Sequence, residues 1–103
     1  MNQSNRSYNK TLFVWDEKKR QANLLKHRLD FADAALVYEN ATKITLTSER
    51  HGESRHADTA VIQVSNTCLT LVYVERSPAI RVISFRAASR RERQLFARAR
   101  QQD

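Results

Sequence analysis

The sequence of 103 residues has a formal net charge of +7, with 41% hydrophobic and 28% charged residues, a size and balance typical of one globular domain. It contains no apolar run near the roughly 20 residues that cross a membrane and no secretory signal, so we expect a cytoplasmic protein with no membrane association. With one glycine and one cysteine in the chain, a glycine-rich nucleotide loop and a disulfide framework are excluded, and we expect neither a cofactor nor a metal ion.

The first third of the sequence predicts a strand followed by a helix. Residues 1–10 are polar, so we expect a flexible extension ahead of a single domain over residues 11–103. The β-branched and aromatic side chains at 11–15 predict a strand. Asp16 is placed to accept hydrogen bonds from the first amides of a helix that ends near Arg28. The apolar spacing predicts a core-facing stripe on that helix, made of Ala22, Leu25 and Leu29 with the stem of Lys18 in line.

A second, shorter helix and four strands are predicted next. Asp30 is the expected N-cap of the helix. Its core-facing positions are Phe31, Ala34, Ala35 and Tyr38. The four strands are expected at 43–49, 59–65, 68–75 and 80–86. Residues 50–56 are expected to form a charged loop between the first two strands. Because the connections are short, the strands should form an antiparallel meander with the apolar third strand near its centre.

The C-terminal segment, residues 76–103, holds eight arginines against two carboxylates, a net charge of +6. Such a segment suits a polyanion because neutralising phosphates releases counterions, although it can also be a solvated helix face. Ser89 and Glu92 form a capping box that predicts a final helix. The predicted fold class is therefore α+β, with an antiparallel sheet of four or five strands, two N-terminal helices and one C-terminal helix.

Three motifs, taken in order, resemble the BrnT family of ribonuclease toxins. The opening motif comprises 13–18, Asn23, 26–27, Phe31 and Ala34. The middle motif is 51–55. The C-terminal motif comprises 72–76, 80–84, Arg86, Ala88 and 90–93. The resemblance spans about residues 12–96, and the ordered combination is more specific than any one motif.

This resemblance implies a RelE-like fold and a toxin of a type II toxin–antitoxin module that cleaves RNA and arrests growth. It also implies neutralisation by a BrnA-like antitoxin that carries a ribbon-helix-helix DNA-binding domain. Toxin and antitoxin together are expected to repress their own operon, so that DNA is contacted only through the complex. A homodimer of the toxin within that complex is left open.

Cleavage of RNA by its ribose 2′-OH needs a base, charge stabilisation at the phosphorus and a proton donor for the leaving oxygen; it requires no metal ion. Arg81 and Arg86 are the predicted phosphate clamps, because a guanidinium binds two phosphate oxygens at once and both lie on a strand. The alternation of that strand places them on opposite faces of the sheet. Arg55 is a weaker third clamp.

The acid and the base are less well defined by the sequence. Glu53 or His27 could be the base, and His27 or His51 the acid, while Lys18 could add positive charge. The remaining expected RNA contacts are Trp15, by stacking on a base, and Arg90, by non-specific attraction.

Each of these residues also has an ordinary structural explanation. Trp15 at a strand end is commonly part of the core, His27 can cap a helix C-terminus, and Glu53 can pair with a neighbouring arginine. The alternative functions are a non-catalytic module that binds nucleic acid or serves as the antitoxin's co-repressor, and a structural subunit whose basic helix packs on an acidic protein.

Overall fold

The computed structural model describes residues 3–8, 11–63 and 65–101. In chain order the elements are β1 (Gln3–Tyr8), β2 (Thr11–Asp16), α1 (Glu17–His27), the 3-10 turn η1 (Phe31–Asp33), α2 (Ala35–Tyr38), β3 (Ile44–Arg50), β4 (Glu53–Ile62), β5 (Thr67–Arg76), β6 (Ala79–Ala87) and α3 (Arg90–Gln101). The α+β class and the C-terminal helix are confirmed. The second predicted helix is a 3-10 turn followed by a single turn of α-helix.

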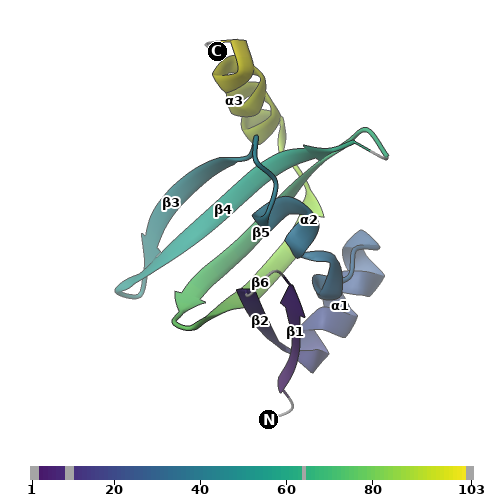
Figure 1. Ribbon diagram of the computed structural model, residues 1–103, viewed down its shortest axis with the longest axis vertical. Coiled ribbons are helices and arrows are strands. Elements are labelled where there is room, and N and C mark those ends of the chain that lie inside the picture. The colour runs from purple at the N-terminus through teal and green to yellow at the C-terminus, as the bar shows by residue number, and fades with distance from the viewer. Residues whose placement is uncertain (1–2, 9–10, 64, 102–103) are drawn as a thin grey trace.

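The six strands form one sheet in the order β1-β2-β6-β5-β4-β3 (Figure 1). β5 therefore lies inside the sheet, as predicted. Strands β2 and β6 are parallel, whereas every other neighbouring pair is antiparallel. The prediction of a purely antiparallel sheet is wrong because β2 returns to the sheet beside the last strand, a long-range pairing that local spacing does not encode.

Strand β1 was not predicted from the sequence. It runs antiparallel to β2 from Gln3↔Asp16 to Tyr8↔Thr11 and forms one edge of the sheet. The division into an extension over residues 1–10 and a domain over residues 11–103 stays a prediction, and residues 1–2 and 9–10 of that extension lie outside the described part of the chain.

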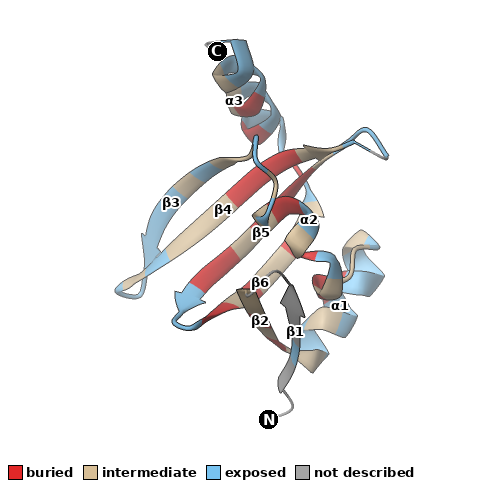
Figure 2. Ribbon diagram, in the orientation of Figure 1, coloured by how far each residue is buried: buried red, intermediate tan, exposed pale blue. Residues whose placement is uncertain are grey.

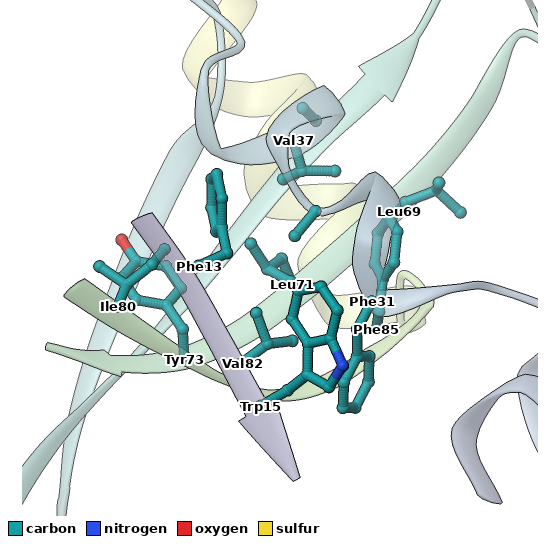
Figure 3. Close-up of a cluster of buried hydrophobic side chains, with 12 residues drawn as sticks. Phe13, Trp15, Phe31, Val37, Leu69, Leu71, Tyr73, Ile80, Val82 and Phe85 are labelled. Carbon is teal, nitrogen blue, oxygen red and sulfur yellow. The ribbon is translucent and has the colours of Figure 1, made fainter. Parts of the chain in front are cut away.

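The hydrophobic core lies between one face of the sheet and the segment η1–α2, which crosses the front of the sheet in Figure 1. Figure 3 shows its buried side chains, among them Phe13, Trp15, Phe31, Val37, Leu71 and Phe85. The Trp15 and Phe31 rings meet edge to face, with centroids 6.4 Å apart, an arrangement that aromatic pairs favour. Because Trp15 is only 4% exposed, its predicted role as a stacking platform for RNA bases is wrong in this structure.

Helix α1 contacts the sheet through a different face from the one predicted. Leu25 is 85% exposed and Ala22 is exposed too, and part of the α1 ribbon is coloured as exposed in Figure 2. The buried residue of α1 is Asn23. Its amide nitrogen donates to the carbonyl oxygen of Phe85 (2.8 Å) and its amide oxygen accepts from the Phe85 backbone amide (3.2 Å).

Asn23 replaces a missing strand at this point of the sheet. β2 pairs with β6 only as far as Val14↔Arg81, so the backbone groups of Phe85 on that edge need another partner. Buried backbone groups are almost always hydrogen-bonded. The side chain of Asn23 satisfies both, and this fixes the rotation of α1. Ala22 and Leu25 of the predicted stripe are left in solvent, whereas Leu29, which follows the helix, packs against the core as predicted.

The predicted loop at 50–56 is a tight hairpin instead. His51 and Gly52 both have positive φ, 53° and 76°, as a two-residue turn that matches the twist of its strands requires. The turn lets β4 begin at Glu53, six residues earlier than predicted. The charged residues after the turn are therefore held on a strand rather than on a loop.

The predicted helix caps are confirmed. The Asp16 carboxylate accepts from the Lys18 amide at 2.9 Å, and Asp30 caps η1 in the same way. At the start of α3, the Ser89 amide donates to Glu92 (2.8 Å) and the Glu92 amide donates to the Ser89 hydroxyl (3.1 Å), which is the reciprocal geometry of a capping box.

Candidate nucleic-acid interface

A β-bulge in β6 places the two strand arginines on the same face of the sheet. Val72 pairs with Ser84 and Tyr73 with Val82, so Ile83 is one extra residue in β6. A bulge of this kind shifts the alternation of side chains by one position. The expectation that Arg81 and Arg86 lie on opposite faces is therefore wrong.

We call the side of the sheet opposite the hydrophobic core the basic face, defined by Arg55, Arg76, Arg81 and Arg86. Ile80, Val82 and Phe85 belong to the core cluster, so the alternation, corrected for the bulge, turns the β6 arginines to the other side. Ala60 marks the core side of β4, which places Arg55 on the basic face. Tyr73 does the same for β5 and Arg76.

Arg81 and Arg55 stand on either side of β5. Arg81 lies directly across from Val74, and Arg55 comes one residue before His56, the partner of Tyr73. Their strands are two strand spacings apart, about 10 Å, a span that two long arginine side chains can close. Within the described residues, neither guanidinium forms a salt bridge or a side-chain hydrogen bond. Both half-buried arginines are thus available to an external anion.

Arg86, in contrast, is held inside the fold. Its two terminal nitrogens donate to the two carboxylate oxygens of Glu92 at 2.8 and 3.0 Å. The Thr70 hydroxyl donates to the same carboxylate at 2.9 Å and lies 2.7 Å from the Thr59 hydroxyl. This buried chain of polar groups joins β4, β5 and β6 to the first turn of α3.

The environment of Glu92 keeps it ionised. Its burial alone would raise the pKa, but the hydrogen bonds from Arg86, the Ser89 amide and Thr70 outweigh that effect and lower the pKa to about 2. The Glu92 hydrogen bond likewise raises the pKa of Arg86. A carboxylate this acidic is a poor proton acceptor near neutral pH, so Glu92 has a structural role.

The other predicted site residues are spread over the molecule. Glu53 is on the basic face but forms a salt bridge with Arg76. His51 is exposed in the β3–β4 turn, two residues before Glu53. Lys18 and His27 lie near opposite ends of α1, and their backbones are about 14 Å apart along the helix axis. A single phosphate group therefore cannot lie close to both residues.

Arg90 is exposed as the first residue of α3. It stands at the end of the sheet where Glu92 anchors the helix (Figure 1), and the last turn of the helix lies near the start of β3, where Ala99 and Arg100 line a pocket with Lys43 and Ile44. The structure brings Arg55, Arg81 and Glu53 onto one face, with Arg86 fixed beside them. Trp15 lies in the core on the other side of the sheet, and Lys18 and His27 lie on α1, which packs beside β6 and β2.

His56 was expected in a loop, where its only assigned role was a poorly supported one as a metal ligand with His51 and Glu53. Its Nε2 lies 3.3 Å from Glu75 and its Nδ1 2.9 Å from the Thr47 hydroxyl. The ring packs against Tyr73, with centroids 5.3 Å apart, so it lies on the core side of the sheet. Both ring nitrogens are engaged there, away from the basic face.

The described residues contain no group of three or more His, Cys, Asp or Glu side chains arranged to hold a metal ion. His51, Glu53 and His56 are close in the sequence, but alternation along β4 turns Glu53 and His56 to opposite faces of the sheet. In the same part of the chain, no helix has the length and apolar content needed to cross a membrane.

Comparison with known proteins identifies the family. The model of the BrnT family, described as the ribonuclease toxin of type II toxin–antitoxin systems, matches residues 15–92. No sequence among curated proteins matches the chain significantly. The matched region begins at the end of β2 and runs to Glu92, so it includes Arg55, Arg81, Arg86 and the carboxylate that holds Arg86. Such toxins act on RNA and are paired with a protein antitoxin. The chain therefore belongs to the BrnT family of ribonuclease toxins.

Proposed function

We propose that this protein is an endoribonuclease toxin that cleaves RNA on the basic face without a metal ion, with Arg81 as the principal phosphate clamp and Arg55 as the second. The observation that carries this proposal is their placement on one rigid face, flanking β5, without a carboxylate partner among the described residues. A guanidinium in such a position can bind two phosphate oxygens at once.

The reaction proposed is transesterification within the RNA. The ribose 2′-oxygen loses its proton to a base and forms a bond to phosphorus. The bond from phosphorus to the 5′-oxygen breaks, and that oxygen takes up a proton. The products are a 2′,3′-cyclic phosphate and a free 5′-hydroxyl. Arg81 and Arg55 stabilise the extra negative charge that develops on the phosphate oxygens as the new bond forms.

Glu53 is the best-placed candidate base. It lies on the basic face two residues before Arg55, about 7 Å along the same strand, and its side chain is 40% exposed. Its salt bridge to Arg76 would have to open or shift when RNA binds. His51, two residues earlier in the exposed turn, is the candidate acid.

Arg86 acts in this proposal as a positioning residue. An RNA phosphate could contact its guanidinium directly only by displacing Glu92 from a bidentate pair. The fork instead holds the first turn of α3 against β5 and β6, and so keeps the basic face in shape at its α3 end. Loss of Arg86 should therefore reduce activity together with stability, whereas loss of Arg81 should reduce activity alone.

The partner proposed is a BrnA-like antitoxin with a ribbon-helix-helix domain, acting in the cytoplasm. The two proteins together would repress their operon, with DNA contacted through the antitoxin and a toxin homodimer within the complex as one arrangement. The family membership supports a protein antitoxin. The exposed arginines of α3 are suited to an acidic surface on such a partner.

The test is induction of the chain alone in a bacterial host, compared with Arg81→Gln and with Arg98→Gln. Arg98 is an exposed α3 arginine outside the proposed site, so it controls for the loss of one positive charge. Wild type and Arg98→Gln should arrest growth and degrade RNA, and Arg81→Gln should do neither while remaining folded. Equal arrest by all three variants would overturn the assignment of Arg81.

A second function, binding of nucleic acid without cleavage, is favoured by one observation: the candidate base Glu53 is paired with Arg76. Purified protein that binds RNA with a steep salt dependence, yet leaves it intact with or without EDTA, would establish this function instead.

A further inference from the structure

A cleft of about 300 Å³ opens at the side of the basic face, between the β3–β4 hairpin and the start of α3. Its lining residues are Leu46, Thr47, Ser48, Ala57 and Arg91. The size is at the lower end for pockets that hold small organic ligands, about 300 to 1,000 Å³. Its lining combines two apolar side chains, the Ser48 hydroxyl and one exposed guanidinium, while the Thr47 hydroxyl is bonded to His56 on the other face of the sheet.

The strand register shows how this cleft is built. Leu46 and Ala57 are directly opposite each other on β3 and β4, so together they make a small, flat apolar surface. The short side chain of Ala57 leaves room above the sheet. Arg91 reaches the same space from the first turn of α3, whose position is fixed by the Glu92–Arg86 fork.

The cleft lies next to one of the proposed phosphate clamps. Ser48, which lines the cleft, is directly opposite Arg55. The Leu46–Ala57 pair is the next pair on the same face, two residues further along, about 7 Å from the Ser48–Arg55 pair. This separation is comparable with the span from a phosphate to the base of the same nucleotide.

We propose that the cleft binds one nucleobase of the RNA whose backbone phosphate is held by Arg55. The base lies flat on Leu46 and Ala57, and the planar guanidinium of Arg91 stacks on it or donates to its edge, as arginine does with unpaired bases. The hydroxyl of Ser48 is positioned to contact a polar atom of the base, whereas the Thr47 hydroxyl is bonded to His56 on the other side of the sheet. This inference rests on the proposed function, because it requires RNA on the basic face.

The chemistry of the cleft favours a base over a free phosphate or a metal ion. A phosphate would find one guanidinium but would have to cover the apolar pair, which gives it no compensating hydrogen bonds. The lining contains no carboxylate, thiol or imidazole that could hold a cation. A planar group with an apolar face and a polar edge matches both parts of the lining.

The test compares a tetranucleotide with its abasic analogue, in which the sugar-phosphate chain is intact but the bases are absent. Both carry 2′-O-methyl groups, so no 2′-OH attack can occur and only binding is measured. Stacking of a single base contributes enough to binding for a roughly tenfold preference of wild type for the intact oligonucleotide. The measured quantity is the ratio of the two dissociation constants.

Two variants should abolish this preference. Ala57→Leu fills the cleft, and Arg91→Ala removes the stacking group. In each variant the ratio of the two dissociation constants should fall toward one. In Ala57→Leu, binding of the abasic chain should change little. Arg98→Ala removes the same charge elsewhere on α3 and should keep the wild-type ratio. If Ala57→Leu does not fold, as judged by thermal unfolding, the comparison of Arg91→Ala with Arg98→Ala decides.

A wild-type ratio near one, or a full tenfold ratio in Arg91→Ala, would overturn the proposed base site. That failure is distinguishable from failure of the proposed function. A protein that cleaves RNA but shows no base preference retains the catalytic proposal and loses this one. A protein that prefers the intact oligonucleotide in a cleft-dependent way but cleaves no RNA retains the base site and loses the catalytic proposal.

Discussion

Replacement of Glu92 by glutamine should destabilise the protein more than the same replacement of an exposed carboxylate such as Glu49. The amide oxygen of glutamine can still accept from Thr70 and from the Ser89 amide, but its NH₂ group would face Arg86 Nη2, a donor, and break the two-pronged pair. Glu92 is 8% exposed, so water compensates this loss poorly.

The magnitude follows from the pKa of Glu92, which is about 2 in the folded state against an ordinary value of 4.5. Each pKa unit corresponds to about 1.4 kcal/mol, so the ionised form contributes at most ~3 kcal/mol at neutral pH. The Arg86 side chain is 30% exposed, and solvent screening reduces this value. We expect Glu92→Gln to lower the free energy of unfolding by about 2 kcal/mol at pH 7.

The pH dependence gives the sharper test. Because the folded-state pKa of Glu92 is lowered, its stabilisation is complete above the unfolded pKa near 4.5 and is lost as pH falls toward 2. Urea unfolding of wild type and Glu92→Gln should therefore show a difference that is constant from pH 6 to 8 and falls to about half by pH 3.

Glu49→Gln is the matched control. Glu49 is an exposed carboxylate on β3 that accepts one hydrogen bond from Ser54, at 3.3 Å. Its replacement should change the free energy of unfolding by less than about 0.5 kcal/mol at any of these pH values. The reasoning about the Glu92 network is refuted if Glu92→Gln behaves like this control, or if its cost does not decrease in acid.

Three further predictions concern the fold and the acid–base pair. Asn23→Ala leaves the Phe85 backbone groups without partners and should cost about 2 to 4 kcal/mol in urea unfolding, whereas a cost below 0.5 kcal/mol would contradict the role of its amide. Leu25→Lys on the exposed face of α1 should change the free energy of unfolding by less than about 0.5 kcal/mol, while Leu71→Ala in the core should cost about 2 to 5 kcal/mol. A large loss of stability in Leu25→Lys would mean that Leu25 faces the core, as the sequence pattern suggested. Glu53→Gln should lower the rate of RNA cleavage about 100-fold and remove the acidic limb of its pH profile, and an unchanged profile would exclude Glu53 as the base.

The features predicted correctly from the sequence are those that neighbouring residues determine. Asp16, Asp30 and the Ser89–Glu92 box cap helices or turns through bonds spanning two or three residues, so local spacing was sufficient. The alternation of apolar residues likewise located most of β5 and β6.

The errors arise where distant segments decide local structure. The rotation of α1 is set by Asn23 bonding to Phe85, 62 residues away, and no periodicity within the helix indicates this partner. The parallel pairing of β2 with β6 and the position of strand β1 also depend on long-range contacts. The sequence of β6 gives no local signal for its bulge, because Ile83 continues an apparently regular strand.

The same distinction applies to the candidate site. Arg81 was proposed from residue type and strand position, and Arg55 was expected in a loop; the register of β4, β5 and β6 gives them a common face. The fork between Arg86 and Glu92 was missed because the capping box accounted for Glu92 by itself. The cleft around Ala57 and Arg91 combines residues from two strands and a helix, so only the folded structure reveals it.

The most direct measurement of the central claim is the end chemistry of RNA cut by purified protein in EDTA. We predict fragments with 2′,3′-cyclic phosphate and 5′-hydroxyl ends, formed at a rate that Arg81→Gln lowers about 100-fold and Arg98→Gln leaves unchanged. Intact RNA, 5′-phosphate ends, or equal cleavage by Arg81→Gln would contradict the account.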